Sequence, residues 1–134
     1  MWSWQAFLEF LGNFQILKGA WMTVWLTLVS FTFGLVLAVL VALAGSSRFG
    51  WLRGIVKFYV WLMRGTPLLV QLIIIFTGLP QLGIKLSAIS AALLGLVLNE
   101  AAYMSEIVRA GILSVPKGQR EAARGLGMSP FTTL

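Results

Sequence analysis

The residues best able to do chemistry in this sequence are polar side chains that lie inside long apolar stretches: Thr66, Gln71, Asn99 and Glu100. Their hydroxyl, amide and carboxylate groups can hydrogen-bond to a polar molecule or to a neighbouring helix. The 134 residues contain no cysteine and no histidine, which excludes disulfides and zinc sites of the Cys/His type. We therefore expect polar contacts within an apolar environment, and no catalytic residue, metal or cofactor.

The composition is typical of a chain in a lipid bilayer. Hydrophobic residues make up 59% of the sequence and charged residues 10%, and the mean hydropathy is +0.92. The net charge of +6 is spread over loops between apolar stretches, which indicates membrane topology signals rather than nucleic-acid binding. No Walker A sequence occurs, so ATP chemistry would have to lie on another chain. The expected environment is membrane lipid.

Hydropathy and periodicity predict one interfacial helix and three spanning helices. Residues 4–17 carry apolar side chains at helical spacing, which favours a helix lying in the membrane interface. The alternative of a signal peptide lacks a basic start and a convincing cleavage pattern. Apolar spans are predicted at residues 21–44, about 55–79 and about 86–109. The expected fold class is an all-α membrane protein.

Small residues repeat every four positions along the first span, at Ser30, Gly34, Ala38 and Ala42. In lipid, such a stripe lets two helix backbones approach closely. The stripe could pack within the chain or form a dimer face, and packing within the chain is the favoured interpretation.

The second span contains a polar stretch that should disturb its helix, Arg64-Gly65-Thr66-Pro67. Pro67 frees a backbone carbonyl one turn back, which is tolerated in a membrane only where protein or water satisfies it. Thr66 and Gln71 supply hydrogen-bonding groups nearby. For Arg64 the favoured interpretation is that its side chain extends to the cytoplasmic headgroups while Pro67 merely kinks the helix. For Thr66 a functional and a structural role are equally open.

The third span becomes polar in its second half. Asn99 should lie past the bilayer midplane, about 20 Å from the outer end of the helix. Glu106 and Arg109 are three residues apart and should compensate one another near the inner surface. Glu100 has no local partner of opposite charge. It must therefore be protonated, paired with another helix or exposed to water.

Residues 114–129, SVPKGQREAARGLGMS, follow the last apolar span and predict a short helix. Pro116 suits the first turn, and Gly127 can end the helix in a left-handed conformation. Ser129-Pro130 predicts the start of another helix. The basic residues Lys117, Arg120 and Arg124 should share one face beside Glu121, while small residues form another face. A small, low-profile face is expected where another backbone docks.

The run Gly118-Gln119-Arg120-Glu121-Ala122-Ala123-Arg124-Gly125-Leu126-Gly127-Met128-Ser129 resembles the EAA loop of the permease subunits of bacterial ABC importers. The upstream run RGTPLLVQL, residues 64–72, is similar to the polar amino acid branch of that family. The resemblance implies a coupling helix that sits in a groove of a cytoplasmic ATPase. The ATPase-coupling residues it implies are Gly118, Glu121, Ala122, Ala123, Gly125 and Leu126. Without the resemblance, an ordinary amphipathic loop between helices would be the alternative.

The resemblance, which covers nearly the whole chain, implies a transmembrane subunit of a polar amino acid importer in the bacterial inner membrane. Its implied partners are cytoplasmic ATP-binding subunits, a second permease subunit and an amino acid-binding protein on the outer side. ATP hydrolysis would lie on a separate chain, so this chain is not expected to be an enzyme. The translocation path is expected to include Thr66, Gln71, Asn99 and Glu100. Which amino acid is carried, and whether two permeases pair as a homodimer or a heterodimer, stay open.

The distribution of basic residues predicts the N-terminus outside and the EAA loop in the cytoplasm. We expect residues 1–134 to form a single transmembrane permease domain, the N-terminal part of a five-helix fold, because two further spans follow the EAA loop in the family. The alternative is a small non-transporting membrane protein that anchors or regulates a cytoplasmic partner.

Overall fold

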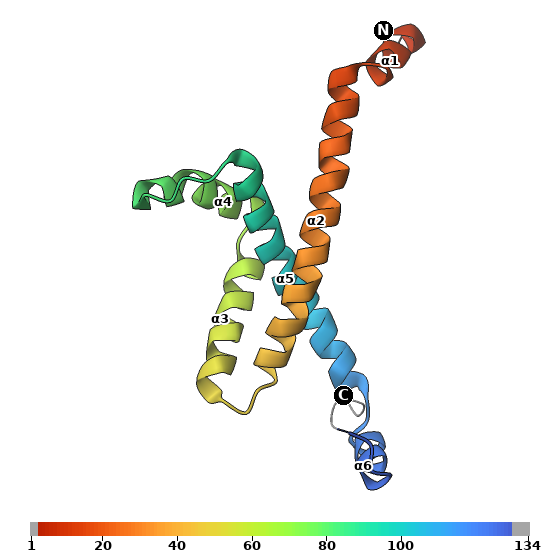
Figure 1. The fold of residues 1–134 in the computed structure, drawn as a ribbon, viewed down its shortest axis with the longest axis vertical. Helices are drawn as coiled ribbons and strands as arrows, with labels where there is room; N and C mark the ends of the chain where they lie inside the picture. Colours follow the sequence, from red (N-terminus) through yellow and green to blue (C-terminus); the bar gives the residue numbers. More distant parts are fainter. Residues whose placement is uncertain (1–2, 130–134) are drawn as a thin grey trace.

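The computed structural model describes residues 3–129, without the side chains of Ala6, Leu8, Glu9 and Lys117. The described residues form helices and connecting loops (Figure 1), which confirms the predicted all-α class. The helices are α1 (Trp4–Leu11), α2 (Phe14–Gly45), α3 (Gly50–Gly65), α4 (Leu68–Ile73), the π-helical η1 (Ile74–Gly78), the 3-10 turn η2 (Leu79–Leu82), α5 (Ala88–Ser114) and α6 (Lys117–Gly125).

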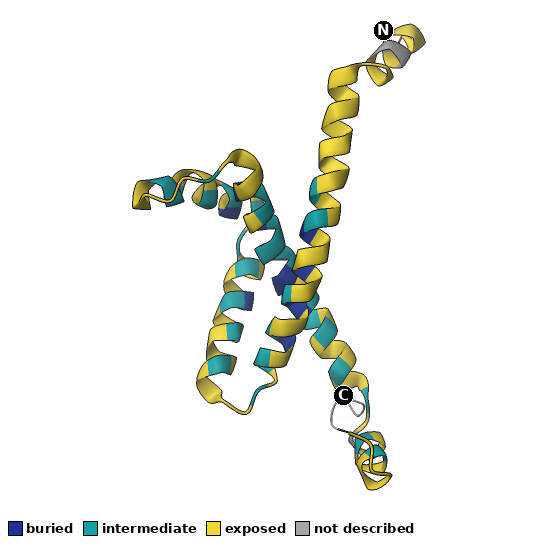
Figure 2. Cartoon of the chain, viewed as in Figure 1, coloured by how far each residue is buried: buried dark blue, intermediate teal, exposed yellow. Residues whose placement is uncertain are grey.

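The long helices α2 and α5 cross one another, and buried residues gather at this crossing (Figure 2). A Cβ added to Gly34 would lie 2.8 Å from Cγ and 2.9 Å from Cβ of Glu100, so the two backbones approach closely. The predicted small-residue stripe is buried within the chain, as favoured: Ser30, Gly34, Ala38 and Ala42. On α5 the buried residues are Ala91, Gly95, Ala101, Ala102 and Ser105.

The first predicted helix is shorter than expected, and the first span is longer. α1 ends at Leu11, and residues 14–17 belong to α2. The reason is Asn13, whose side chain accepts a 2.9 Å hydrogen bond from the backbone N–H of Gln15 and so caps α2. Residues 14–20 therefore extend the first span beyond its predicted start at residue 21.

The second predicted span is not one continuous helix. α3 and the segment from α4 to η2 are bent by 106° at residues 66–67. Thr66 is extended, with φ −120° and ψ 143°, because the residue before a proline is excluded from helical geometry by the proline ring. The expectation that Pro67 only kinks the helix is therefore wrong. The chain leaves α3 sideways, as α4 shows in Figure 1.

Side chains satisfy the backbone at this break. In a continuous helix the carbonyl of Met63 would accept from the N–H of residue 67, which proline lacks. Nε2 of the buried Gln71 donates to that carbonyl at 2.8 Å, and also lies 3.1 Å from the Thr66 carbonyl. The Thr66 hydroxyl donates to the Leu62 carbonyl at 2.8 Å. The broken segment thus keeps its freed carbonyls bonded in an apolar environment, as membranes require.

α5 and α6 differ from their predicted bounds by a few residues. α5 is capped by Ser87, whose hydroxyl accepts a 3.1 Å bond from the Ser90 N–H, and it ends at Ser114 rather than near residue 109. Pro116 is the cap of α6 rather than part of its first turn. Gly127 has φ 77°, the left-handed conformation predicted for it. The helix predicted to start at Ser129-Pro130 lies outside the described residues.

Within residues 3–129, α2 and α5 are each long and apolar enough to cross a membrane, and α3 with the bent segment after it would make a third crossing. Large apolar side chains on the outer surfaces of these helices are exposed, among them Leu28, Val36, Leu40 and Ile107. Such surfaces suit lipid or further helices.

Substituting Gly34 by alanine should destabilise the α2–α5 crossing, because the new methyl group would collide with the Glu100 side chain near its backbone. Overpacking of this kind costs about 1–3 kcal/mol. Thermal unfolding in detergent should show a lower midpoint for Gly34→Ala. Gly19→Ala is the control on the same helix, because a Cβ there meets nothing within 4 Å. Equal midpoints for the two variants would contradict the close approach.

Candidate functional site

The polar residues singled out from the sequence gather at the broken helix. Nδ2 of Asn99 on α5 lies 3.2 Å from Oε1 of Gln71 and 3.5 Å from the Met63 carbonyl. Nε2 of Gln71 also donates to the Thr66 hydroxyl at 2.8 Å. Three of the four predicted path residues, Thr66, Gln71 and Asn99, therefore form one hydrogen-bonded cluster that joins α3, α4 and α5.

Most of the polar capacity of this cluster is already used. The Gln71 amide donates to backbone and hydroxyl oxygens and accepts from Asn99. Among the described residues, Oδ1 of Asn99 and the carboxylate of Glu100 have no hydrogen-bond partner and no ion pair. The cluster thus holds the bend, while Asn99 and Glu100 keep free acceptors.

Glu100 follows Asn99 on α5 but does not join the cluster. Its side chain packs against Gly34 of α2 and is half-buried. Of the environments expected for Glu100, contact with another helix is therefore present. That contact is made by the aliphatic part of the side chain, and no cationic residue of the described chain pairs with the carboxylate.

A second cluster, which unlike the first is charged, lies nearer the end of α5 that leads to α6. Arg109 donates to Glu106 through two nitrogens, at 3.1 and 2.9 Å, which confirms the predicted compensation of this pair. Nη1 of Arg64 lies 3.9 Å from the same carboxylate, and its guanidinium lies 5.4 Å from the centre of the Tyr103 ring. Arg64 therefore has partners on α5, which the interpretation as a headgroup contact alone did not include.

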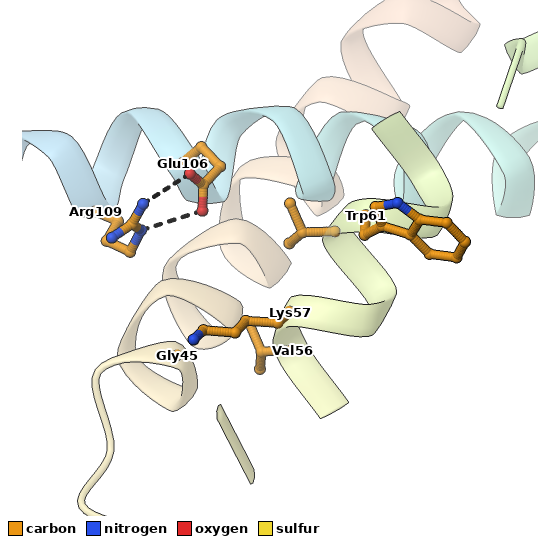
Figure 3. Close-up of a pocket in the computed structure, with 7 residues that line it drawn as sticks. Gly45, Val56, Lys57, Trp61, Glu106 and Arg109 are labelled. Carbon is orange, nitrogen blue, oxygen red and sulfur yellow. Dashed lines mark hydrogen bonds and ion pairs between the residues drawn. The ribbon is translucent and has the colours of Figure 1, made fainter. Parts of the chain in front are cut away.

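A cavity of about 300 Å³ lies where α2, α3 and α5 converge beside Glu106 and Arg109 (Figure 3). Its other lining residues are Gly45, Val56, Lys57, Val60 and Trp61. The four-residue spacing of Lys57 and Trp61 places both on one face of α3. Only the packing of α3 against α5 shows that this face lines the same cavity as Glu106.

α6 presents most of the predicted coupling residues to the surroundings. Gly118, Glu121, Ala122 and Gly125 are exposed, Ala123 is half-buried, and Leu126 is 83% exposed. A Cβ added to Gly118 or Gly125 meets nothing within 4 Å in the described chain. Gly125 is the last residue of α6. Glu121 makes no ion pair with Arg124.

Arg120 does not share an outward basic face with Arg124. Its Nη2 donates to the carbonyls of Ile112 and Val115, at 3.1 and 3.3 Å. These groups lie at the end of α5, where helix carbonyls have no partner within the helix. The predicted basic face is therefore wrong for Arg120, because these acceptors turn the side chain back toward α5.

Comparison with known proteins identifies the architecture. Residues 30–134 match the family described as binding-protein-dependent transport system inner membrane component. A crystal structure of an amino acid ABC transporter with histidines superposes with a TM-score of 0.86 at 35% identity, over 99% of this chain and 61% of that chain.

Curated relatives agree with the family match. The chain is 44% identical to the probable amino-acid ABC transporter permease protein YckA of Bacillus subtilis, over 89% of this chain and 53% of the relative. It is 48% identical to the L-cystine transport system permease protein TcyB of the same organism, over 87% of this chain and 50% of the relative. The chain thus spans about half the length of the curated relatives it matches. Together with its apolar helices, these matches identify a membrane-embedded chain that belongs to the family of binding-protein-dependent transport system inner membrane components.

Proposed function

We propose that this chain contributes the transmembrane path of an ATP-driven amino acid importer and couples that path to ATP hydrolysis on a partner. The observation that carries the proposal is α6, a short exposed helix at the end of α5 that displays the EAA-like residues. The named relatives are amino acid permeases, which favours transport over a non-transporting membrane anchor.

The proposed assembly follows from the family. Cytoplasmic ATP-binding subunits dock on α6, a second permease completes the path, and a binding protein delivers the amino acid from outside. Residues 1–134 act in it as one transmembrane domain. This chain itself has no enzymatic role, and the hydrolysis of ATP takes place on the partner.

The proposed orientation places the N-terminus outside and α6 in the cytoplasm. Arg48 lies in the loop between α2 and α3, Arg53 and Lys57 lie in the first half of α3, and α6 carries further basic residues. Positive charge is retained on the cytoplasmic side of membranes, which favours this orientation. In this orientation α6 and the loop at residues 46–49 face the same compartment. This agrees with Figure 1, where both lie in the lower part of the view, away from the N-terminus.

The proposed path is bordered by the cluster at the helix break. Thr66 and Gln71 shape the bend, and Asn99 and Glu100 offer the acceptors that remain free. The ammonium group of an amino acid is the complementary donor for a carboxylate. Glu100 therefore contacts the substrate or a facing helix of the assembly, and not lipid, where a charge is costly.

A bulky residue at Gly125, or a charge reversal at Glu121, should detach the ATPase without unfolding the permease. A Cβ added to Gly125 meets nothing within 4 Å in the described chain, so we expect a loss of binding in Gly125→Leu to report on the partner surface. We expect Gly125→Leu and Glu121→Lys to lower both the ATPase retained during purification and the substrate-stimulated hydrolysis after reconstitution. The full-length permease should be used with its ATPase.

Gly125→Ala is the matched control, because it also removes the glycine but adds only one methyl group. Inverted vesicles should bind added ATPase and right-side-out vesicles should not, which tests the orientation in the same assay. If Gly125→Leu and Glu121→Lys both retained all of the ATPase and the full substrate-stimulated hydrolysis, α6 would be an ordinary connecting segment.

Removal of the Glu100 charge should impair uptake. A hydrogen bond to a charged group contributes about 1.5–3 kcal/mol, so Glu100→Gln should raise the uptake KM by roughly tenfold or more while the ATPase stays bound. Glu100→Asp keeps the charge and should retain more activity than Glu100→Gln. Unchanged expression, assembly and uptake in Glu100→Leu would show that Glu100 faces lipid and has no role in transport or assembly.

A further inference from the structure

The chain uses the same pattern of side-chain-to-backbone hydrogen bonds at two helix junctions. At the first, the carbonyl of Met63 loses its donor because residue 67 is proline, and Gln71 supplies the replacement at 2.8 Å. At the second, the carbonyl of Ile112 loses its donor because residue 116 is proline, and Arg120 supplies the replacement at 3.1 Å. In both cases the donor lies four residues after the proline and eight after the acceptor.

The correspondence extends to the remaining contacts. Each donor also reaches the carbonyl of the residue just before its proline, Thr66 for Gln71 at 3.1 Å and Val115 for Arg120 at 3.3 Å. Both prolines cap the following helix with nearly equal angles, φ −62° and ψ 136° at the first and φ −58° and ψ 143° at the second. The two junctions therefore share the same pattern of side-chain hydrogen bonds and the same proline geometry, although the residue before the proline differs in φ, −120° at Thr66 and −74° at Val115.

The donors differ in charge, and this difference suits their positions. The first junction lies within the broken span, where a neutral amide is far cheaper to bury than a guanidinium. The second lies at the carboxyl end of α5, where the helix dipole and the unpaired carbonyls favour a cation. Nε of Arg120 is buried without a hydrogen-bond partner in the described chain. The bonds from Nη2 to the two carbonyls therefore outweigh the cost of leaving the buried Nε without an acceptor.

From this geometry we propose that Arg120 is the positioning residue that fixes the angle between α5 and α6, so that a displacement of α6 moves α5. Without the Arg120 side chain, α5 and α6 would be joined here only by the backbone of Val115 and Pro116, whose ψ angles can rotate. The contacts from Arg120 to Ile112 and Val115 close a ring across that joint and make it rigid. The proposal rests on the proposed role of α6 in coupling. It assigns Arg120 to the side of α6 that faces α5, and not to the side on which the ATPase docks.

The test combines a geometric and a functional measurement on the full-length permease in membranes with its ATPase. Spin labels on cysteines at Ile107 of α5 and Gln119 of α6, both exposed, report the distance between the helices. Arg120→Leu should raise the population of other joint angles by about tenfold or more, the order expected when a charged hydrogen-bond donor is lost, and so broaden this distance distribution. It should also lower the amount of amino acid taken up per ATP hydrolysed. The ATPase should still co-purify.

Two further variants separate this role from a general effect of charge. Arg124→Leu removes an exposed arginine of the same helix whose side chain makes no hydrogen bond or ion pair in the described chain, and it should keep the narrow distance distribution. Arg120→Lys should keep most of the narrow distance distribution and of the uptake per ATP. A single nitrogen of Arg120 donates to both Ile112 and Val115, and an ammonium group can replace that donor.

The outcomes distinguish this proposal from the proposed function. A narrow distribution and full coupling in Arg120→Leu would overturn the role of Arg120 even in a working importer. Loss of the ATPase from Arg120→Leu, with a narrow distribution, would also overturn it by placing Arg120 on the docking surface. Failure of the unmodified protein to transport would overturn the proposed function, while the distance measurement would still test the α5–α6 joint.

Discussion

The structure depends on one constraint, that a backbone carbonyl freed by proline in an apolar environment must find another donor. The bond from Gln71 to Met63 meets this constraint and permits the 106° bend after α3. Asn99 then bonds to Gln71 and ties the bend to α5. The position of the segment from α4 to η2, and with it the border of the proposed path, follows from a side chain that replaces a missing N–H.

The close crossing of α2 and α5 fixes the position of α5, the helix to which the bend is bonded. Gly34 allows the Glu100 side chain to lie directly on α2, while Gly95 similarly accommodates Leu72 of α4, whose Cδ2 would lie 2.6 Å from an added Cβ. One glycine on α2 and one on α5 thus allow these two close contacts, and α5, which carries Asn99 and Glu100, also leads to α6. The proposed path and the proposed coupling surface therefore share one continuous helix.

Local rules predicted much of this arrangement. Pro67 signalled a freed carbonyl and Gln71 a nearby donor, and the spacing of Ser30, Gly34, Ala38 and Ala42 predicted a packed face. The size of the bend was not predictable, because proline alone is compatible with a kink or a break. The inward turn of Arg120 was missed because helical spacing with Lys117 and Arg124 indicated a shared face. Its acceptors, at the end of α5, become apparent only when the junction is seen in three dimensions.

The carbonyl of Met63 can be observed directly, because Met63-Arg64 is the only methionine-arginine pair among these 134 residues. Labelling methionine carbonyl carbons with ¹³C and arginine nitrogens with ¹⁵N selects this one peptide by solid-state NMR in membranes. Accepting a hydrogen bond moves a carbonyl carbon resonance to lower field. Gln71→Leu should therefore shift the Met63 signal to higher field, while Gln81→Leu, which removes an exposed glutamine from η2, should not. An unchanged Met63 signal in Gln71→Leu would contradict the account.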